Sequence, residues 1–167
     1  MNPKDLIAEI EFETTSTRRL LERIPAEKLP WAPHDKAMPL GQLAFHVATI
    51  PGNNLSFAND GKTNVDVLTA HHIPASKNEI LENFETSIAR ALQLLEKISD
   101  DWGTQTWYLI KNDQPIFSVP RSLMARLLVM NHWYHHRGEL VSYLRILGVP
   151  IPSVYGPSAD EDPFACS

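Results

Sequence analysis

The chain contains very little cysteine and no long hydrophobic run. Its single cysteine, Cys166, excludes an intrachain disulfide and is typical of a protein in the reducing cytoplasm. So close to a chain end, Cys166 is also a poor candidate for a nucleophile, which needs a desolvated pocket. Apolar runs are interrupted within about ten residues, too few to span a bilayer, and the start lacks a signal-peptide pattern. We therefore expect a cytoplasmic protein with no membrane partner.

An excess of basic residues is absent as well. The net charge is −5 and the isoelectric point is near 5.8, so no basic surface is expected for binding nucleic acid. A hydrophobic content of 43% and a charged content of 21% are ordinary for a globular protein of 167 residues. No internal repeat, low-complexity tract or linker divides the sequence. We therefore predict one domain over residues 1–167.

Apolar residues recur at helical spacing in four segments. These are residues 7–24, 39–60, 76–98 and 120–148. Pro25 stops the first segment, and Pro51-Gly52 is predicted to kink or end the second, which then resumes. Ser76 and Glu79 form a capping-box pair at the start of the third. In the first segment Glu9, Glu11 and Glu13 are most simply a solvated face.

The connections between these segments are long. Residues 107–110 and 116–119 flank a polar stretch, which predicts an irregular loop or a small hairpin. Residues 149–167 are rich in proline and glycine and are expected to form an irregular, ordered strap. The sequence thus predicts an all-α protein, a four-helix bundle with long connecting loops and a C-terminal strap.

Three histidines are candidates for a metal site. His132 and His136 are four residues apart in the fourth segment, so both rings lie on one helical face and can reach a single ion. At about 100° per residue, that face also carries apolar side chains, among them Ala125, Leu128 and Val129. His46 lies on the apolar face of the second segment. Ligands that project inward from facing helices are the usual way to build a metal centre in a bundle.

Other polar residues are weaker candidates. Glu139 follows His136 by three residues, where it could act as an orienting partner, a further ligand or a general base. Gln42 and Asn53 share the side of His46 and are candidates to orient a substrate. His135 falls toward the edge of the face of His132 and is a weaker ligand candidate. His34 and the pair His71-His72 lie in polar loops and are predicted to be solvated, with a border position at the site as the alternative for His34. An alternative for the buried histidines stays open, because a histidine on an apolar face is often an ordinary core residue.

Several motifs resemble the DinB family of metalloenzyme-like proteins. They are His132 and His136 ahead of Arg137-Gly138, then Tyr143-Leu144-Arg145, Gly148-Val149-Pro150, Tyr155-Gly156-Pro157-Ser158-Ala159-Asp160-Glu161 and, upstream, the stretch from Pro39 to Ala48. This resemblance covers nearly the whole chain. It implies an up-down-down-up bundle with one divalent metal ion held by His46, His132 and His136. The chain has Glu139 where glutamine often follows Arg-Gly in the family, which places an extra carboxylate near the site.

Three histidines leave a coordination position open, as expected for a catalytic ion. Imidazole ligands suit zinc or nickel, with iron or copper as alternatives. The resemblance implies a metal-dependent enzyme, either a hydrolase or a thiol-dependent S-transferase, and hence a small-molecule substrate such as a low-molecular-weight thiol. Two alternatives remain, namely a non-catalytic metal-binding sensor or stress-response protein, and a purely structural bundle.

The fourth segment also carries apolar residues opposite its histidines. Leu127, Met130, Tyr134 and Val141 lie on this face, where a surface helix would be polar. Either the C-terminal strap covers them or a second copy of the chain does. We expect a two-fold homodimer, since symmetric dimers commonly bury such a face.

Overall fold

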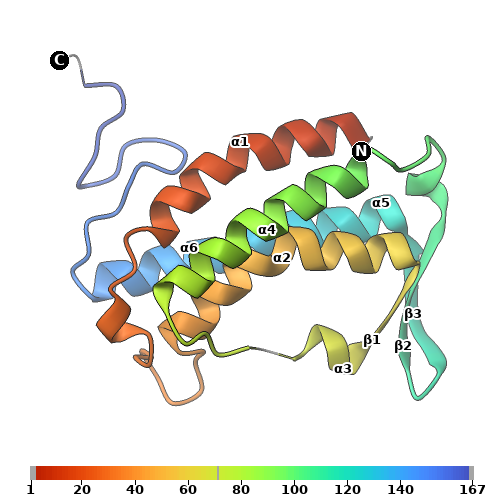
Figure 1. The fold of residues 1–167 in the computed structure, drawn as a ribbon, viewed down its shortest axis with the longest axis horizontal. Helices are drawn as coiled ribbons and strands as arrows, with labels where there is room; N and C mark the ends of the chain where they lie inside the picture. The colour runs from red at the N-terminus through yellow and green to blue at the C-terminus, as the bar shows by residue number, and fades with distance from the viewer. Residues whose placement is uncertain (1–2, 71, 166–167) are drawn as a thin grey trace.

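Four long helical segments lie alongside one another in the computed structural model, which describes residues 3–70 and 72–165 (Figure 1). They are α1 (Pro3–Leu21), α2 (Leu40–Asp60), α4 (Lys77–Leu95) and a last segment composed of α5 (Arg121–Met124), η3 (Ala125–Asn131) and α6 (His132–Ile146). Helix α2 is central, because it packs against both α4 and α6. The short helices are η1 (Ala26–Lys28), α3 (Val65–Leu68) and η2 (Trp102–Thr104). The four predicted helical segments are therefore confirmed.

The prediction of an all-α fold was wrong, because a three-stranded sheet lies at one end of the helices (Figure 1). Its strands, in the order β1-β2-β3, are β1 (Lys62–Asn64), β2 (Thr106–Lys111) and β3 (Gln114–Pro120). Strands β2 and β3 form the small hairpin, one of the two predicted alternatives. Asn112 and Asp113 at its tip have φ of 50° and 61°, and two positive values suit the twist of a tight hairpin.

Strand β1 was not predicted. It is three residues long and pairs in parallel with β2, some forty residues later in the sequence. So short a strand carries no alternation of polar and apolar residues, and its partner is decided by tertiary packing. Helix α3 follows it, with the Asn64 side chain accepting the N–H of Asp66 at its start.

Helix α2 continues through Pro51 instead of ending there. The next residue, Gly52, donates its N–H to the hydroxyl of Ser87 on α4 at 2.9 Å, and that hydroxyl donates to the carbonyl of Thr49 at 3.2 Å. The hydroxyl thus satisfies backbone groups at the proline. Glycine is required at this point, because a Cβ on Gly52 would lie 2.7 Å from the Ser87 carbonyl oxygen. Helices α2 and α4 can therefore approach closely.

The capping box of the third helix is confirmed with one difference. The N–H of Glu79 donates to Ser76 Oγ at 3.2 Å, as predicted. The Glu79 carboxylate accepts the N–H of Ala75 at 2.7 Å, one residue before the expected partner. Its other oxygen lies 2.6 Å from Nε2 of His72. The start of α4 thus also fixes a loop histidine.

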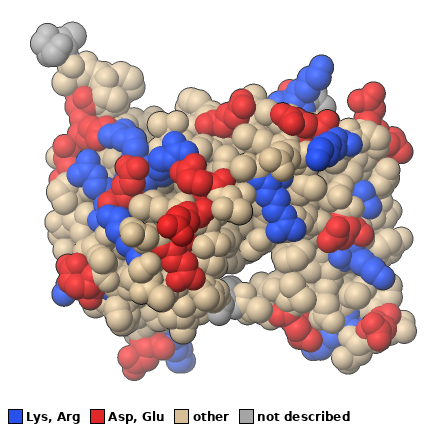
Figure 2. All heavy atoms as spheres, in the orientation of Figure 1, with Lys and Arg blue, Asp and Glu red and all other residues tan. Residues whose placement is uncertain are grey.

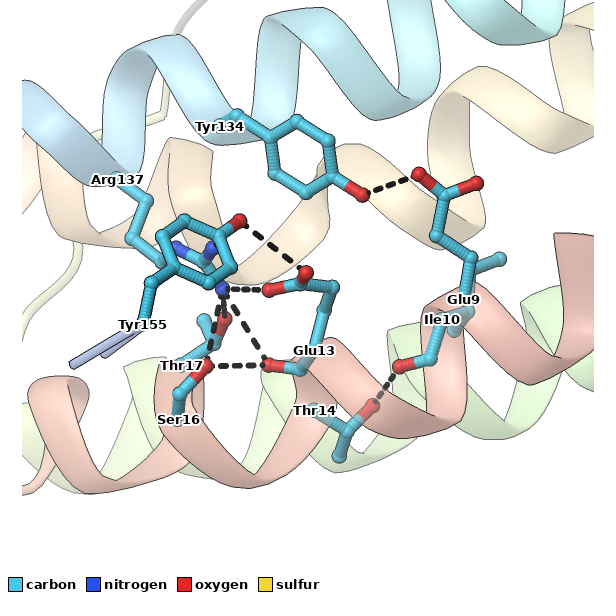
Figure 3. A network of polar contacts seen from close by, with 9 residues as sticks. All are labelled: Glu9, Ile10, Glu13, Thr14, Ser16, Thr17, Tyr134, Arg137 and Tyr155. Atoms are coloured by element: carbon cyan, nitrogen blue, oxygen red, sulfur yellow. Dashed lines mark hydrogen bonds and ion pairs between the residues drawn. The ribbon is translucent and has the colours of Figure 1, made fainter. Parts of the chain in front are cut away.

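The prediction of a solvated face was wrong for Glu13, and Glu9 is only half-exposed. Glu13 is buried and its Oε2 lies 2.6 Å from Nη1 of Arg137, which is only 2% exposed (Figure 3). Glu9 accepts a hydrogen bond of 2.6 Å from the Tyr134 hydroxyl. Burial, followed by this bond, raises the pKa of Tyr134. Glu11 is exposed, as expected. Periodicity could not reveal the buried partner, since Arg137 lies 124 residues away.

The C-terminal strap is confirmed as an irregular segment tied to α1 and α6. Tyr155 contacts the buried pair, donating to Glu13 and accepting from Arg137 (Figure 3). Two ion pairs hold the chain further along, Arg19 with Glu161 at 2.5 Å and Arg145 with Asp160 at 2.6 Å. Cys166 lies outside the described residues.

The apolar face of the last segment is largely covered within the chain. Met130 is fully buried, and Tyr134 and Val141 border the groove beneath the strap. Leu127 is 41% exposed. Part of the reason to expect a homodimer is therefore removed, and the dimer stays a prediction. No helix in the described part of the chain is long and apolar enough to cross a membrane.

Candidate metal centre

His46, His132 and His136 converge between α2 and α6. One ring nitrogen from each of them lies within 4.8 Å of the others, and all three side chains are half-buried. Nε2 of His46 and Nε2 of His132 are 3.0 Å apart. The ring centroids of His46 and His136 are 4.6 Å apart, and those of His132 and His136 are 4.5 Å apart. The structure therefore brings together the three residues that the sequence singled out.

The donor set fits a divalent ion. With zinc–nitrogen bonds of about 2.0–2.1 Å, two tetrahedral imidazole ligands have nitrogens about 3.3 Å apart. The observed spacings, from 3.0 Å to no more than 4.8 Å, bracket that value. Three neutral imidazoles offer nitrogen lone pairs to one point, and a cation can accept all of them. Such a set suits zinc and the later transition metals.

Glu139 orients one of these rings. Its Oε2 lies 2.6 Å from Nδ1 of His136, a contact that favours the tautomer with its proton on Nδ1, in which Nε2 is the nitrogen suited to bind a metal. The other oxygen of Glu139 is 3.5 Å from Nε2 of the exposed His135. Of the roles considered for Glu139, this contact supports the orienting partner.

A π-helical segment directly precedes His132. In η3 the N–H of His132 bonds to the carbonyl of Leu127, five residues earlier, instead of that of Leu128 as in an α-helix. The carbonyl of Leu128 accepts a hydrogen bond from the side-chain amide of Asn54 on α2. A π turn changes the rotation along the helix, so the segment to which Asn54 bonds is the one that sets the direction of His132. Sequence periodicity could not have identified Asn54, which is buried and polar on an otherwise apolar face.

A cavity of about 120 Å³ lies beside His46. Gln42 and Asn53, the two predicted substrate-orienting residues, both line it. Its other lining residues come from α2, α3 and the chain after α3, and they are Phe45, Thr49, Ile50, Asn54, Phe57, Val67, Leu68, Ala70 and His72. Among the described residues, Glu139 is not part of this lining.

The loop histidines differ from one another. His72 is exposed, as predicted for a loop residue, but it also lines the cavity and packs on Phe45, with ring centroids 4.6 Å apart. The signal that could have found it is Glu79, seven residues later, which was interpreted only as a capping residue. His34 accepts the N–H of Lys36 within its own exposed turn. His71 lies outside the described residues.

Charged side chains of both signs are interspersed over the face formed by α1 and α4 (Figure 2). Arg18 pairs there with Glu85 at 2.6 Å. On this face the basic side chains form no continuous surface of the kind that nucleic acid binding requires. The absence of a nucleic-acid partner stays a prediction.

Comparison with known proteins points to one family. The sequence model of the DinB family matches residues 1–162. A curated relative, the uncharacterized protein YrdA of Bacillus subtilis (strain 168), is 24% identical over 151 residues, covering 90% of this chain and 86% of YrdA.

Two solved structures share the fold. One is a DinB-like protein from Bacillus cereus ATCC 10987, with a TM-score of 0.69, 23% identity, and coverage of 87% of this chain and 92% of that chain. The other is a DinB-like protein from Bacillus subtilis, with a TM-score of 0.70, 16% identity, and coverage of 90% and 97%.

Proposed function

The chain belongs to the DinB family, and on that premise we propose that it is a metal-dependent enzyme. His46, His132 and His136 hold one divalent ion, zinc or nickel first, with iron or copper as alternatives. The reaction is a hydrolysis or the transfer of a group to a low-molecular-weight thiol. The bundle has the up-down-down-up arrangement of the family, and the protein forms a two-fold homodimer.

The main support for this proposal is the convergence of three half-buried imidazole rings. A histidine that serves only the core is usually satisfied by one hydrogen bond, whereas these rings direct their nitrogens at one another. The carboxylate on the far nitrogen of His136 is the arrangement that metal-ligating histidines use. A fully protein-ligated structural site would supply a fourth side chain.

The residues of the metal centre and those of the adjoining cavity have different roles in this proposal. A bound divalent ion supplies a positive charge that lowers the pKa of a water or thiol beside it. Glu139 keeps His136 in the required tautomer. Gln42 and Asn53 present amides to the cavity beside His46, where they can hold the polar groups of a substrate. The apolar side chains of Phe57 and Leu68 exclude water from the same space.

The rival function is a metal-binding sensor or stress-response protein without turnover. The cavity favours the enzyme, because a sensor does not need a space lined by amides next to its ion. A sensor would bind metal equally well and would leave every substrate unchanged.

The test begins with protein loaded separately with zinc and with nickel, one ion per chain being verified by elemental analysis. Each form is assayed with 4-nitrophenyl acetate and an anilide for hydrolysis, and with 1-chloro-2,4-dinitrobenzene plus 2-mercaptoethanol for transfer. Turnover that disappears in His136→Ala and persists in His135→Ala is the expected result. A fully loaded protein that turns over no member of either panel would favour the sensor.

A further inference from the structure

The cavity beside His46 has a second wall that the proposed metal centre does not use. This wall consists of α3 and the chain after it, and it includes Val67, Leu68, Ala70 and His72. Among the described residues that line the cavity, His46 and His72 alone carry imidazole rings, whose nitrogen atoms can accept a proton. Since His46 belongs to the proposed metal centre, His72 is the group available for proton transfer.

His72 is held in place from two helices. Its Nε2 lies 2.6 Å from Oε1 of Glu79 on α4. Its ring packs against Phe45 on α2, with centroids 4.6 Å apart and planes inclined at 52°. Phe45 directly precedes His46. The ring is therefore held at the wall of the cavity that His46 also lines, although its own backbone lies in a loop.

Glu79 is fixed independently of His72. Its Oε2 accepts the N–H of Ala75 at 2.7 Å, and its own N–H caps the helix through Ser76 at 3.2 Å. The bond from Ala75, and after it the bond from His72, lowers the pKa of Glu79. A charged, oriented carboxylate accepts the proton on Nε2 of His72, which leaves Nδ1 as the basic nitrogen of the neutral ring.

We propose that His72 is the proton acceptor of this cavity and that Glu79 is the residue that positions it. This inference rests on the proposed function. The S–H bond of an entering thiol, or the O–H bond of water, breaks, and its electron pair stays on sulfur or oxygen. The proton passes to Nδ1 of His72, and Glu79 stabilises the resulting imidazolium. While the thiol is bound the proton stays on the ring, and only after the product leaves does the 53% exposed His72 side chain return it to solvent.

The experiment counts protons and does not require turnover. Zinc-loaded protein is titrated with 2-mercaptoethanol by calorimetry at pH 7, in two buffers of different ionisation enthalpy. The difference in heat gives the number of protons released to buffer per thiol bound. Wild type should retain the thiol proton, whereas His72→Asn should release more, by roughly half to one proton per thiol. Glu79→Gln should give an intermediate value.

His34→Asn is the matched control, since it removes an exposed histidine that bonds only within its own turn. It should leave the proton count unchanged. A role of His72 limited to supporting the start of α4 would lower the melting temperature of His72→Asn without changing the count, and would overturn the inference. Equal counts in wild type and His72→Asn would do the same. If zinc-loaded wild type binds no thiol, the thiol chemistry of the proposed function fails and this inference falls with it.

Discussion

His136 and Arg137 are neighbours in the sequence, but they enter two polar clusters of opposite character. Arg137 is buried among groups that complement it, with Glu13 at 2.6 Å and Thr17 Oγ1 at 2.9 Å (Figure 3). His136 instead packs against three other imidazole rings, those of His46, His132 and His135. In a cluster of complementary donors and acceptors, the groups satisfy one another's hydrogen bonds, and the cluster stabilises the fold. A cluster of imidazole rings can instead offer several nitrogen atoms to one cation, which is the role proposed above for these histidines.

Removing Arg137 should produce the largest effect. In Arg137→Met the Glu13 carboxylate stays buried without its partner, so the free energy of unfolding should fall by about 3–5 kcal/mol. Urea denaturation measures this loss. Arg18→Met is the control, because its exposed pair with Glu85 should contribute less than about 1 kcal/mol.

A double variant tests whether the unpaired Glu13 charge causes this loss of stability. Adding Glu13→Leu to Arg137→Met removes the stranded charge and should recover part of the lost stability. Equal stability of Arg137→Met and Arg18→Met would contradict a structural role for the buried network. Metal content per folded chain should be unchanged in all of these variants.

Removing His136 should abolish metal binding with a smaller effect on the apo protein. Wild type should carry about one divalent ion per chain. At a free metal concentration 100-fold above Kd, that ion stabilises the folded state by about 2.7 kcal/mol, which raises the melting temperature. His136→Ala should lose both the ion and this rise, whereas His135→Ala should keep them. Elemental analysis and thermal unfolding with and without a chelator provide the measurements, and equal metal in wild type and His136→Ala would refute the site.

Glu139→Gln should weaken the centre without removing it. The amide accepts the Nδ1 proton of His136 less strongly than the carboxylate does, so metal affinity should fall about 10- to 100-fold. Competition with a chromophoric chelator measures the affinity. Unchanged affinity together with lost turnover would instead identify Glu139 as a general base.

Asn54→Ala should have the smallest effect on stability. It removes the hydrogen bond to the Leu128 carbonyl, which should cost about 1 kcal/mol and allow the π-helical turn before His132 to relax. The affinity for metal should fall as well, because the relaxed turn no longer directs His132 at the other two histidines. Asn53→Ala, the neighbouring position on the cavity wall, keeps the bond to Leu128 and should change neither quantity. If both variants bind metal like wild type, the π turn does not position His132.

Much of the helical fold could be predicted from local pattern. Helical periodicity and the Ser76 cap identify α4, and the four-residue spacing places His132 and His136 on one face. These features depend on residues within a few turns of one another, where the backbone geometry is known in advance. His46 was selected because it lies on the apolar face of the second predicted helix, and the family resemblance implied the same residue; its place opposite His132 and His136 depends on how the helices pack.

The sequence by itself thus determined the long helices and the paired histidines, because both follow from a period of 3.6 residues. Only the tertiary structure decided that Glu13 is buried against Arg137, that Asn54 holds the π turn, and that His72 enters the cavity. Each of these contacts joins side chains that are distant in the sequence or extend from a loop. At these positions, helix packing decides whether a polar side chain faces water or a partner. The periodicity of the local sequence therefore cannot predict it.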